Sequence, residues 1–271
     1  MTRLFGILNL TRDSFSDGGR FLNSADALVH ARRLHEDGAD VLDVGAESTH
    51  PDAEAVPADV EIARLLPVVE PLRAAGASIS IDTHKPAVMS ALLPLGVDFI
   101  NDVTGFRNPA AVEAVAGSAA RLVVMHARHA DLINTRAERI DEAPADLVHR
   151  IRDFFGDRIE ELTRAGIARN RLILDPGMGF FLSSNPAASL TALRDIDRLL
   201  VFGCPLLVSV SRKSFIGATL GGDGPPRPID ERGAGTLAAE LWAAAHGVSY
   251  IRTHDVRATR DALSLWRAIA T

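Results

Sequence analysis

Short apolar stretches rich in Val, Ile and Leu recur along the whole chain. We count eight: "RLFGILNL" (3–10), "VLDVGA" (41–46), "SISIDT" (78–83), "DFINDV" (98–103), "RLVVMH" (121–126), "RLILDPG" (171–177), "PLLVSVS" (205–211) and "SYIRTHD" (249–255). Their apolar residues are nearly continuous rather than alternating, which is typical of parallel strands buried on both faces of a sheet. The pattern therefore predicts eight parallel strands.

Segments with helical spacing separate these strands. In 24–38, Ser24 can cap a helix, Gly38 can end it, and four apolar residues share one face: Ala27, Leu28, Ala31 and Leu34. Strand and helix alternate to the end of the chain, and eight such units are typical of a TIM (β/α)8 barrel. A doubly wound open sheet would usually carry a glycine-rich turn after its first strand, and "ILNLTRDSF" has none. We predict an α/β TIM barrel, with residues 1–271 as a single domain.

Net charge, the length of the apolar stretches and the cysteine count limit the kinds of partner that this chain can bind. The net charge of −6 and the pI near 5.8 argue against nucleic acid or an anionic membrane, because both require a concentrated basic face. No apolar stretch approaches the ~20 residues that cross a bilayer, and "MTRLFGILNL" lacks the pattern of a secretory signal. The one cysteine, Cys204, excludes an intramolecular disulfide. We expect a cytoplasmic protein that binds small molecules.

Polar residues occupy the carboxyl ends of the predicted strands, where TIM barrels build their active sites. They are Asn9, Asp43, Glu47, Asp82, Asn101, His126, Asp175, Lys213, Arg252 and His254. The acceptors suit a ring edge rich in N–H groups, and the cationic and imidazole donors suit oxyanions. The set indicates a heterocyclic substrate joined to a phosphate.

The chain has only two lysines, Lys85 and Lys213. A compact ammonium can enter a ring-binding pocket that is too narrow for a guanidinium. This explains why position 213 has lysine in a chain whose other basic residues are almost all arginine. A helix that starts at Ser214 would add N–H groups for a carboxylate. We interpret Lys85, beside Pro86, as a surface residue.

Eight motifs together resemble the dihydropteroate synthase family: "GILNLTRDSFSDGG", "LDVGAEST", "SIDTHK", "INDVTG", "VVMH", "LDPGMGF", "SRKSFIG" and "RTHDV". The resemblance covers essentially the whole chain in order. It implies a TIM barrel, commonly a homodimer, that joins 7,8-dihydropterin-6-ylmethyl diphosphate to 4-aminobenzoate and releases 7,8-dihydropteroate and diphosphate. It also implies a mechanism in which diphosphate leaves early and the arylamine captures a cationic pterin methylene.

The resemblance implies roles for individual residues. Pterin would be held by Asp82, Asn101, Met125, Asp175 and Lys213. Diphosphate would be held by Asn9, Thr49, His50, Arg252 and His254, with Asn9 also binding Mg²⁺. Aminobenzoate would meet Pro51, Phe180, Phe181 and Ser214. Lys213, Asp17 in the first loop, Arg252 and His254 would be the catalytic residues.

The chain departs from the family in two loops. "STHPDA" has His50 and Asp52 where arginine and glycine are usual, and Arg12 is a possible substitute for the missing arginine. Phe181 follows Phe180 in "DPGMGFFLS", and these stretches resemble the Sul-type branch associated with sulfonamide resistance. A bulky aromatic there could exclude the drug, so the enzyme could be sulfonamide-insensitive, with ordinary loop packing as the alternative.

Two other functions stay open at this point. The first is a catalytically silent pterin-binding paralogue, which the loss of the loop arginine at His50 would favour. The second is a metal hydrolase, suggested by His126 and His129 with Asp131 nearby. The second is weakly supported, because such barrels usually carry paired histidines after the first strand and "ILNL" offers none.

Overall fold

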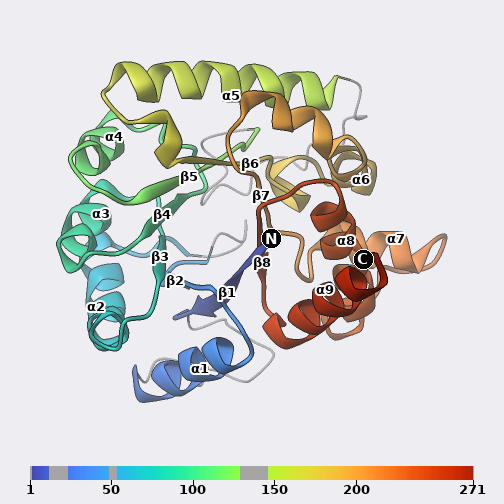
Figure 1. Ribbon diagram of the computed structural model, residues 1–271, viewed down its shortest axis with the longest axis horizontal. Helices are drawn as coiled ribbons and strands as arrows, with labels where there is room; N and C mark the ends of the chain where they lie inside the picture. Colours follow the sequence, from blue (N-terminus) through green and yellow to red (C-terminus); the bar gives the residue numbers. More distant parts are fainter. Residues whose placement is uncertain (1, 12–23, 49–53, 129–145, 271) are drawn as a thin grey trace.

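A closed barrel of parallel strands, surrounded by helices, forms the computed structural model, which describes residues 2–11, 24–48, 54–128 and 146–270 (Figure 1). The strands are β1 (Arg3–Asn9), β2 (Val41–Gly45), β3 (Ile79–Asp82), β4 (Phe99–Asp102), β5 (Arg121–Met125), β6 (Leu172–Asp175), β7 (Leu207–Val208) and β8 (Tyr250–Thr253). Their order in the sheet is β6-β5-β4-β3-β2-β1-β8-β7. The eight predicted strands and the TIM barrel are confirmed.

The seventh strand is the weakest part of the barrel. The sequence predicts a strand over 205–211, whereas β7 spans only two residues. A single parallel bridge between Leu174 and Leu206 joins this region to β6, supported by a 2.9 Å hydrogen bond from Leu174 N to Pro205 O. Pro205 has no N–H to donate, and the chain turns soon after Val208, so the ladder is short at both ends.

Helices cover the barrel on its outside (Figure 1). Within the described residues they are α1 (Ser24–Glu36), α2 (Ala58–Ala74), α3 (Pro86–Leu92), α4 (Pro109–Ala116), α5 (Leu147–Arg164), α6 (Pro186–Arg194), α7 (Ser214–Gly221), α8 (Gly233–Ala245) and α9 (Val256–Ala270). α4 and α6 each start with proline after an asparagine cap, and the caps Asn108 and Asn185 accept hydrogen bonds from the N–H two residues on. Predicted features of α1 are also confirmed: Ala27, Ala31 and Leu34 are buried, and Gly38 has a φ of +99°.

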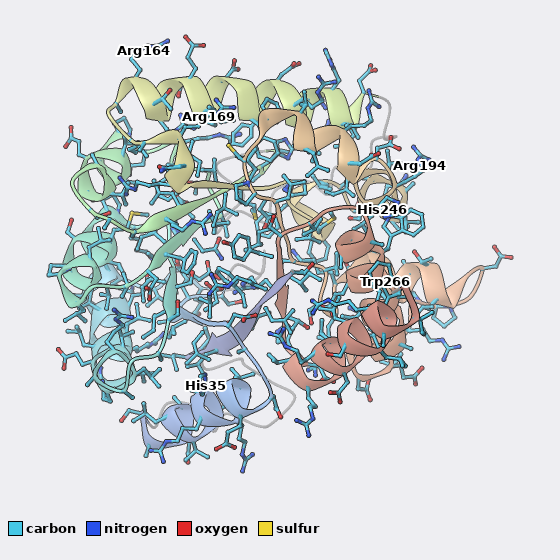
Figure 2. The ribbon with its side chains drawn as sticks, viewed as in Figure 1. His35, Arg164, Arg169, Arg194, His246 and Trp266 are labelled. Atoms are coloured by element: carbon cyan, nitrogen blue, oxygen red, sulfur yellow. The ribbon has the colours of Figure 1, made fainter. Side chains whose placement is uncertain are left out.

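Polar side chains project from the outer faces of these helices into solvent. Arg164 on α5 and Arg194 on α6 have side chains that are 68% and 67% exposed, and Figure 2 shows both at the periphery of the molecule. None of the described helices combines the length and apolar character needed to cross a membrane.

The interior of the barrel contains an apolar layer near the amino ends of the strands. It consists of Phe5, Val41, Phe99, Val123, Ile173, Leu207 and Tyr250. Phe5 packs edge-on against Phe99 and Tyr250, with ring centres 5.0 and 5.4 Å apart. Seven of the eight strands contribute, so this layer fixes the distance between strands on opposite sides of the barrel.

Candidate active site

A polar layer lies one step further along the strands. Strand side chains alternate between the two faces, so the residue two positions after an inward-facing residue also faces inward. This rule leads from the apolar layer to Asp43, Asn101, Met125, Asp175 and Arg252. Asp82, at the end of β3, pairs with Gly45 on one side and Asn101 on the other. The structure thus brings the predicted pterin residues together at the carboxyl end of the barrel.

Arg252 lies at the centre of this layer. Its Nε is 2.5 Å from Asp43 Oδ2 and its Nη2 is 2.6 Å from Asp82 Oδ2, so one guanidinium bridges β2 and β3 from β8. Burial disfavours its charge, but the two carboxylates raise its pKa above the usual value. Asn101 Nδ2 lies 3.4 Å from the same Asp43 oxygen. Asp43 Oδ1 is buried and has no hydrogen-bond partner among the described residues, so the layer retains an acceptor.

Two further carboxyls in the layer are held partly protonated by burial. Burial raises the pKa of Asp82 to about 7, even though Arg252 opposes the shift. Burial raises the pKa of Asp175 to about 6, against the hydrogen bond from Gly177 N and the charge of Lys213. Gly177 has a φ of +70°, and a Cβ there would meet His126 O at 2.3 Å, so this turn requires glycine. Both carboxyls can therefore donate or accept a proton near neutral pH.

Lys213 reaches the layer through a strained turn. Arg212 adopts a φ of 58°, which is rare for a residue with a side chain, and Lys213 N closes the turn on Val210 O at 3.1 Å. The Lys213 ammonium lies 3.0 Å from Met178 O and 5.0 Å from the centre of the Phe181 ring. Burial lowers its pKa to about 8, and Asp175 opposes that shift.

His254 lies beyond Arg252 and is neutral. Burial lowers its pKa to about 3, and the charges of Arg252 and Arg212 add to the effect. Ser211 Oγ accepts a hydrogen bond from His254 N at 3.1 Å and lies 2.9 Å from Nδ1. The Ser211 proton can therefore point at Nδ1, which leaves the ring proton on Nε2 as a donor to a ligand.

The predicted aminobenzoate residues divide between two environments. Phe181 packs against Val103, Met125 and Ala127 beneath Lys213, whereas Phe180 is 43% exposed. Both belong to a short 3-10 turn at Gly179–Phe181. Ser214 is the first residue of α7, as the sequence predicts. Phe181 therefore lies next to the predicted pterin residues, and Phe180 is nearer to solvent.

The interpretation of Lys85 as a surface residue is wrong. Its ammonium lies 2.6 Å from Glu47 Oε2 and 2.7 Å from Glu61 Oε2, and Glu61 is fully buried. Glu47 also accepts a hydrogen bond from Val56 N at 2.8 Å, which anchors the chain that follows the second loop. Lys85 bridges these two carboxylates and offsets part of their charge, a role that the neighbouring Pro86 could not indicate.

Several predicted residues lie outside the part of the chain that the structure describes: Asp17, Thr49, His50, Pro51, Arg12, Asp52, His129 and Asp131. His126 is buried, and its Nδ1 lies 3.2 Å from Pro176 O. Over the described ranges, no group of three His, Cys, Asp or Glu side chains is arranged to hold a metal ion. These ranges therefore give the metal-hydrolase alternative no support.

Sequence reasoning assigned no role to three residues of the site. The sequence marks Asp43 only as a strand-end residue; the register pairs it with Ser80, and Arg252 links it to Asp82. Arg212 carries no sequence signal, because neither its type nor its neighbours indicate a left-handed backbone. Glu61 lies on α2, and only the fold brings it to Lys85.

Comparisons with known proteins agree with this geometry. Residues 5–254 match the family described as pterin binding enzyme. Dihydropteroate synthase type-2 of Escherichia coli is 48% identical over 98% of this chain and 95% of its own length. A Xanthomonas albilineans dihydropteroate synthase structure with 4-aminobenzoic acid has a TM-score of 0.88 and 40% identity, over 100% of this chain and 93% of that one. A second structure from that organism, in complex with 7,8-dihydropteroate, has a TM-score of 0.84 and 39% identity, over 100% and 94%. The chain belongs to the dihydropteroate synthase family, whose enzymes act in folate biosynthesis.

Proposed function

We propose that this chain condenses 7,8-dihydropterin-6-ylmethyl diphosphate with 4-aminobenzoate, with the bond to diphosphate breaking before the new bond forms. The C–O electron pair leaves with diphosphate, and the amine lone pair then forms the C–N bond. The nitrogen loses its proton to solvent or to the departed diphosphate. The observation that carries the proposal is a polar layer in which Asp43, Asn101 and Asp175 are buried and Asp82 and Lys213 are partly buried, adjoining the donors of β8.

The carboxyls of the layer are suited to the pterin ring. Asp175 is buried and the Asp82 side chain is only 15% exposed, so each gains more from a ring N–H than it would in water. Positive charge that develops on the pterin methylene favours their ionised forms. Lys213 donates to a ring acceptor from the other side, and Met125 with Phe181 offers an apolar surface for the ring face.

The leaving group meets donors at the ends of β1 and β8. The neutral His254 offers Nε2–H, and Arg252 would transfer Nη2 from Asp82 to a phosphate oxygen, which frees Asp82 for the pterin. Mg²⁺ would bind here with low affinity in the absence of diphosphate. Asn9 supplies one amide oxygen, and the described residues include no cluster of carboxylates arranged to coordinate the ion. When bound, Mg²⁺ would neutralise negative charge on the diphosphate, which would supply its remaining oxygen ligands together with water.

The aminobenzoate would lie toward solvent from the pterin. Its carboxylate would accept from the N–H groups at Ser214, where α7 begins beside the Lys213 turn. Phe180 and Pro51 would flank its ring. The arylamine is uncharged near neutral pH, so the reaction needs no strong base.

The proposed insensitivity to sulfonamides rests on Phe180 and Phe181. Phe181 packs against Met125 and Lys213, and this fixed position would bring the neighbouring exposed Phe180 to the outer end of the aminobenzoate slot. A drug that extends past the carboxylate position would meet that ring, whereas the smaller substrate would not.

A homodimer is supported by an apolar groove between α6, α7 and α8. The groove encloses about 430 Å³, and its lining includes Leu190, Leu220 and Trp242, which are 42%, 44% and 46% exposed. A second copy placed against this face would bury these side chains.

The proposed cytoplasmic location is compatible with the one cysteine of the chain. Cys204 is a free, buried thiol, which is typical of proteins in a reducing compartment.

The test is diphosphate release from the purified protein with the pterin diphosphate, 4-aminobenzoate and Mg²⁺. We expect release that depends on aminobenzoate and is lost in Lys213→Ala, with Arg198→Ala, an exposed arginine on another face, as the matched control. A titration with sulfamethoxazole then decides insensitivity, and inhibition near the aminobenzoate KM would refute it. Pterin binding without release would favour the silent paralogue.

A further inference from the structure

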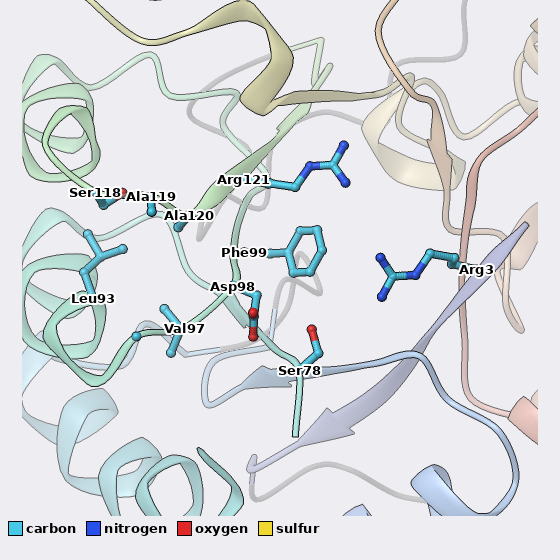
Figure 3. Close-up of a pocket in the computed structure, with 11 residues that line it drawn as sticks. Arg3, Ser78, Leu93, Val97, Asp98, Phe99, Ser118, Ala119, Ala120 and Arg121 are labelled. Carbon is cyan, nitrogen blue, oxygen red and sulfur yellow. The ribbon is translucent and has the colours of Figure 1, made fainter. Parts of the chain in front are cut away.

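A second cavity opens at the other end of the barrel, around the amino ends of the strands. It encloses about 550 Å³. Arg3 on β1 and Arg121 on β5 contribute to it from different sides, and Figure 3 shows both guanidinium groups extending toward the ring of Phe99. Arg3, Phe99 and Arg121 are the first residues of their strands, so this cavity is separate from the polar layer at the strands' carboxyl ends.

The two guanidinium groups gather around one aromatic ring. The Cζ atoms of Arg3 and Arg121 lie 5.9 and 5.4 Å from the centre of the Tyr250 ring. Arg121 also donates a hydrogen bond to the Tyr250 hydroxyl. Stacking on an aromatic face holds a guanidinium in place while its N–H groups at the edge stay available for an anion.

Neither arginine has a carboxylate partner among the described residues. The nearest acidic lining residue is Asp98, and its Oδ2 is already bound by Arg73 at 2.9 Å and by Ile79 N at 2.9 Å. Two like charges that face one cavity repel each other, and an anion between them removes that repulsion. The surplus of positive charge is local, because the chain as a whole carries −6.

The rest of the lining is mixed. Leu93, Val97 and Ala120 form an apolar wall. The Ser78 hydroxyl also lines the cavity and makes no hydrogen bond within the described part of the chain. The volume exceeds what a bare phosphate needs and is in the range of small-molecule sites.

We propose that this cavity is a second binding site, for a small amphipathic oxyanion whose charged head contacts Arg3 and Arg121 and whose apolar body lies against Leu93, Val97 and Ala120. The head group is a phosphate or a carboxylate, which the two guanidinium groups recognise by the same charge-assisted hydrogen bonds. The site is independent of the pterin site and of the reaction proposed there.

Tyr250 provides a local probe, because it is the only tyrosine in the chain. Protein labelled with 3-fluorotyrosine would give one ¹⁹F resonance, from a ring in contact with both arginines of the proposed site. We would titrate it with phenyl phosphate, benzoate and inorganic phosphate at constant ionic strength. We expect a saturable shift, with phenyl phosphate or benzoate binding about tenfold more tightly than inorganic phosphate because the ring buries apolar surface.

The variants make the result specific to this cavity. Arg3→Gln removes a guanidinium that makes no side-chain hydrogen bond in the described structure, so folding should be preserved. It should weaken binding about tenfold or more, while Arg3→Lys retains part of the affinity. Arg257→Gln, which removes the same charge from an exposed site on α9, should leave it unchanged. Absence of a saturable shift, an unchanged titration in Arg3→Gln, or equal affinity for all three probes would overturn the proposal.

Discussion

The two ends of the barrel interior use the same strands for opposite purposes. Near the amino ends, the inward positions are apolar and buried, as Phe5 and Val41 illustrate. Two residues later, the inward positions on the same strands carry Asp43, Asn101, Asp175 and Arg252. One layer stabilises the fold, and the other holds charges out of water at a cost in stability.

That cost is visible in individual groups. Within the part of the chain that the structure describes, Asp43 Oδ1 is buried without a partner. Burial raises the pKa of Asp82 to about 7 and that of Asp175 to about 6. A structure selected only for stability would place apolar side chains here. Ligand binding, as proposed above, would account for the polar layer, and the apolar layer would supply the rigidity that keeps its groups in position.

The largest expected effect on stability comes from a large-to-small substitution in the apolar layer, which tests whether this layer stabilises the fold. Phe5→Ala removes a fully buried ring that packs against Phe99 and Tyr250. We expect a loss of about 3–5 kcal/mol in the free energy of unfolding. Activity per folded molecule should change little below the melting transition. Denaturant unfolding and active-site-normalised turnover check both; a large loss of turnover in fully folded protein would contradict the division of roles.

The matching change in the polar layer is Lys213→Ala. We expect kcat/KM for the pterin diphosphate to fall by about 100-fold, or about 2.7 kcal/mol, because a buried charged donor is lost. Stability should change little, since the ammonium makes one hydrogen bond, to Met178 O. Lys213→Arg keeps the charge and enlarges the group. Near-normal turnover in that variant would refute the argument that the pocket requires a compact cation.

The pH dependence of kcat/KM sharpens the comparison further, because the polar layer contains groups that titrate near neutrality and the apolar layer contains none that do. Asp82, with a pKa of about 7, and Asp175, with a pKa of about 6, must be ionised to stabilise cationic pterin, so activity should fall as the pH drops below about 7. Lys213, with a pKa of about 8, should add a decline at higher pH. Rates between pH 5 and 9 test this bell shape. A flat acidic limb would show that these carboxyls are not required in their ionised form.

The smallest expected effect is a gain in stability from Asp175→Asn, opposite in sign to the loss expected for Phe5→Ala. The pKa of Asp175 is higher in the folded chain, about 6, than the ordinary 3.8, so its contribution to stability falls as the pH rises from about 4 to 6 and stays reduced above that. Asp175→Asn cannot ionise and still offers Oδ1 to Gly177 N. Its thermal midpoint should be modestly higher than wild type at pH 8 and similar at pH 4. A lower midpoint at pH 8 would contradict the cost assigned to the polar layer.

Much of this architecture could be predicted from local sequence patterns. Continuous apolar runs located all eight strands, and the buried face of α1 and its end at Gly38 matched the structure, because these signals depend on neighbours in the chain. The strand-end rule also placed Asp82, Asn101 and Asp175 at the correct end of the barrel. The predicted roles of these residues in binding substrate came from the family resemblance. The alternation of side chains along a strand explains why they face the barrel interior together.

The failures have a common physical origin. Lys85 was placed at the surface because its partners, Glu47 and Glu61, are distant in sequence and meet it only in the fold. The turn at Arg212 was not anticipated because its left-handed backbone is imposed by contacts such as the 3.0 Å hydrogen bond from Arg212 N to Thr236 Oγ1. Long-range partners of charged groups are set by tertiary packing, which periodicity does not encode.

The central claim is that the polar layer is the pterin site. Isothermal titration calorimetry of the pterin diphosphate with wild type and Asp175→Asn, without aminobenzoate, tests it most directly. The account predicts binding by wild type and an affinity at least about tenfold weaker in the variant, because a charge-assisted hydrogen bond is lost while the fold is retained. Equal affinities in two equally folded proteins would contradict it and would place the pterin elsewhere.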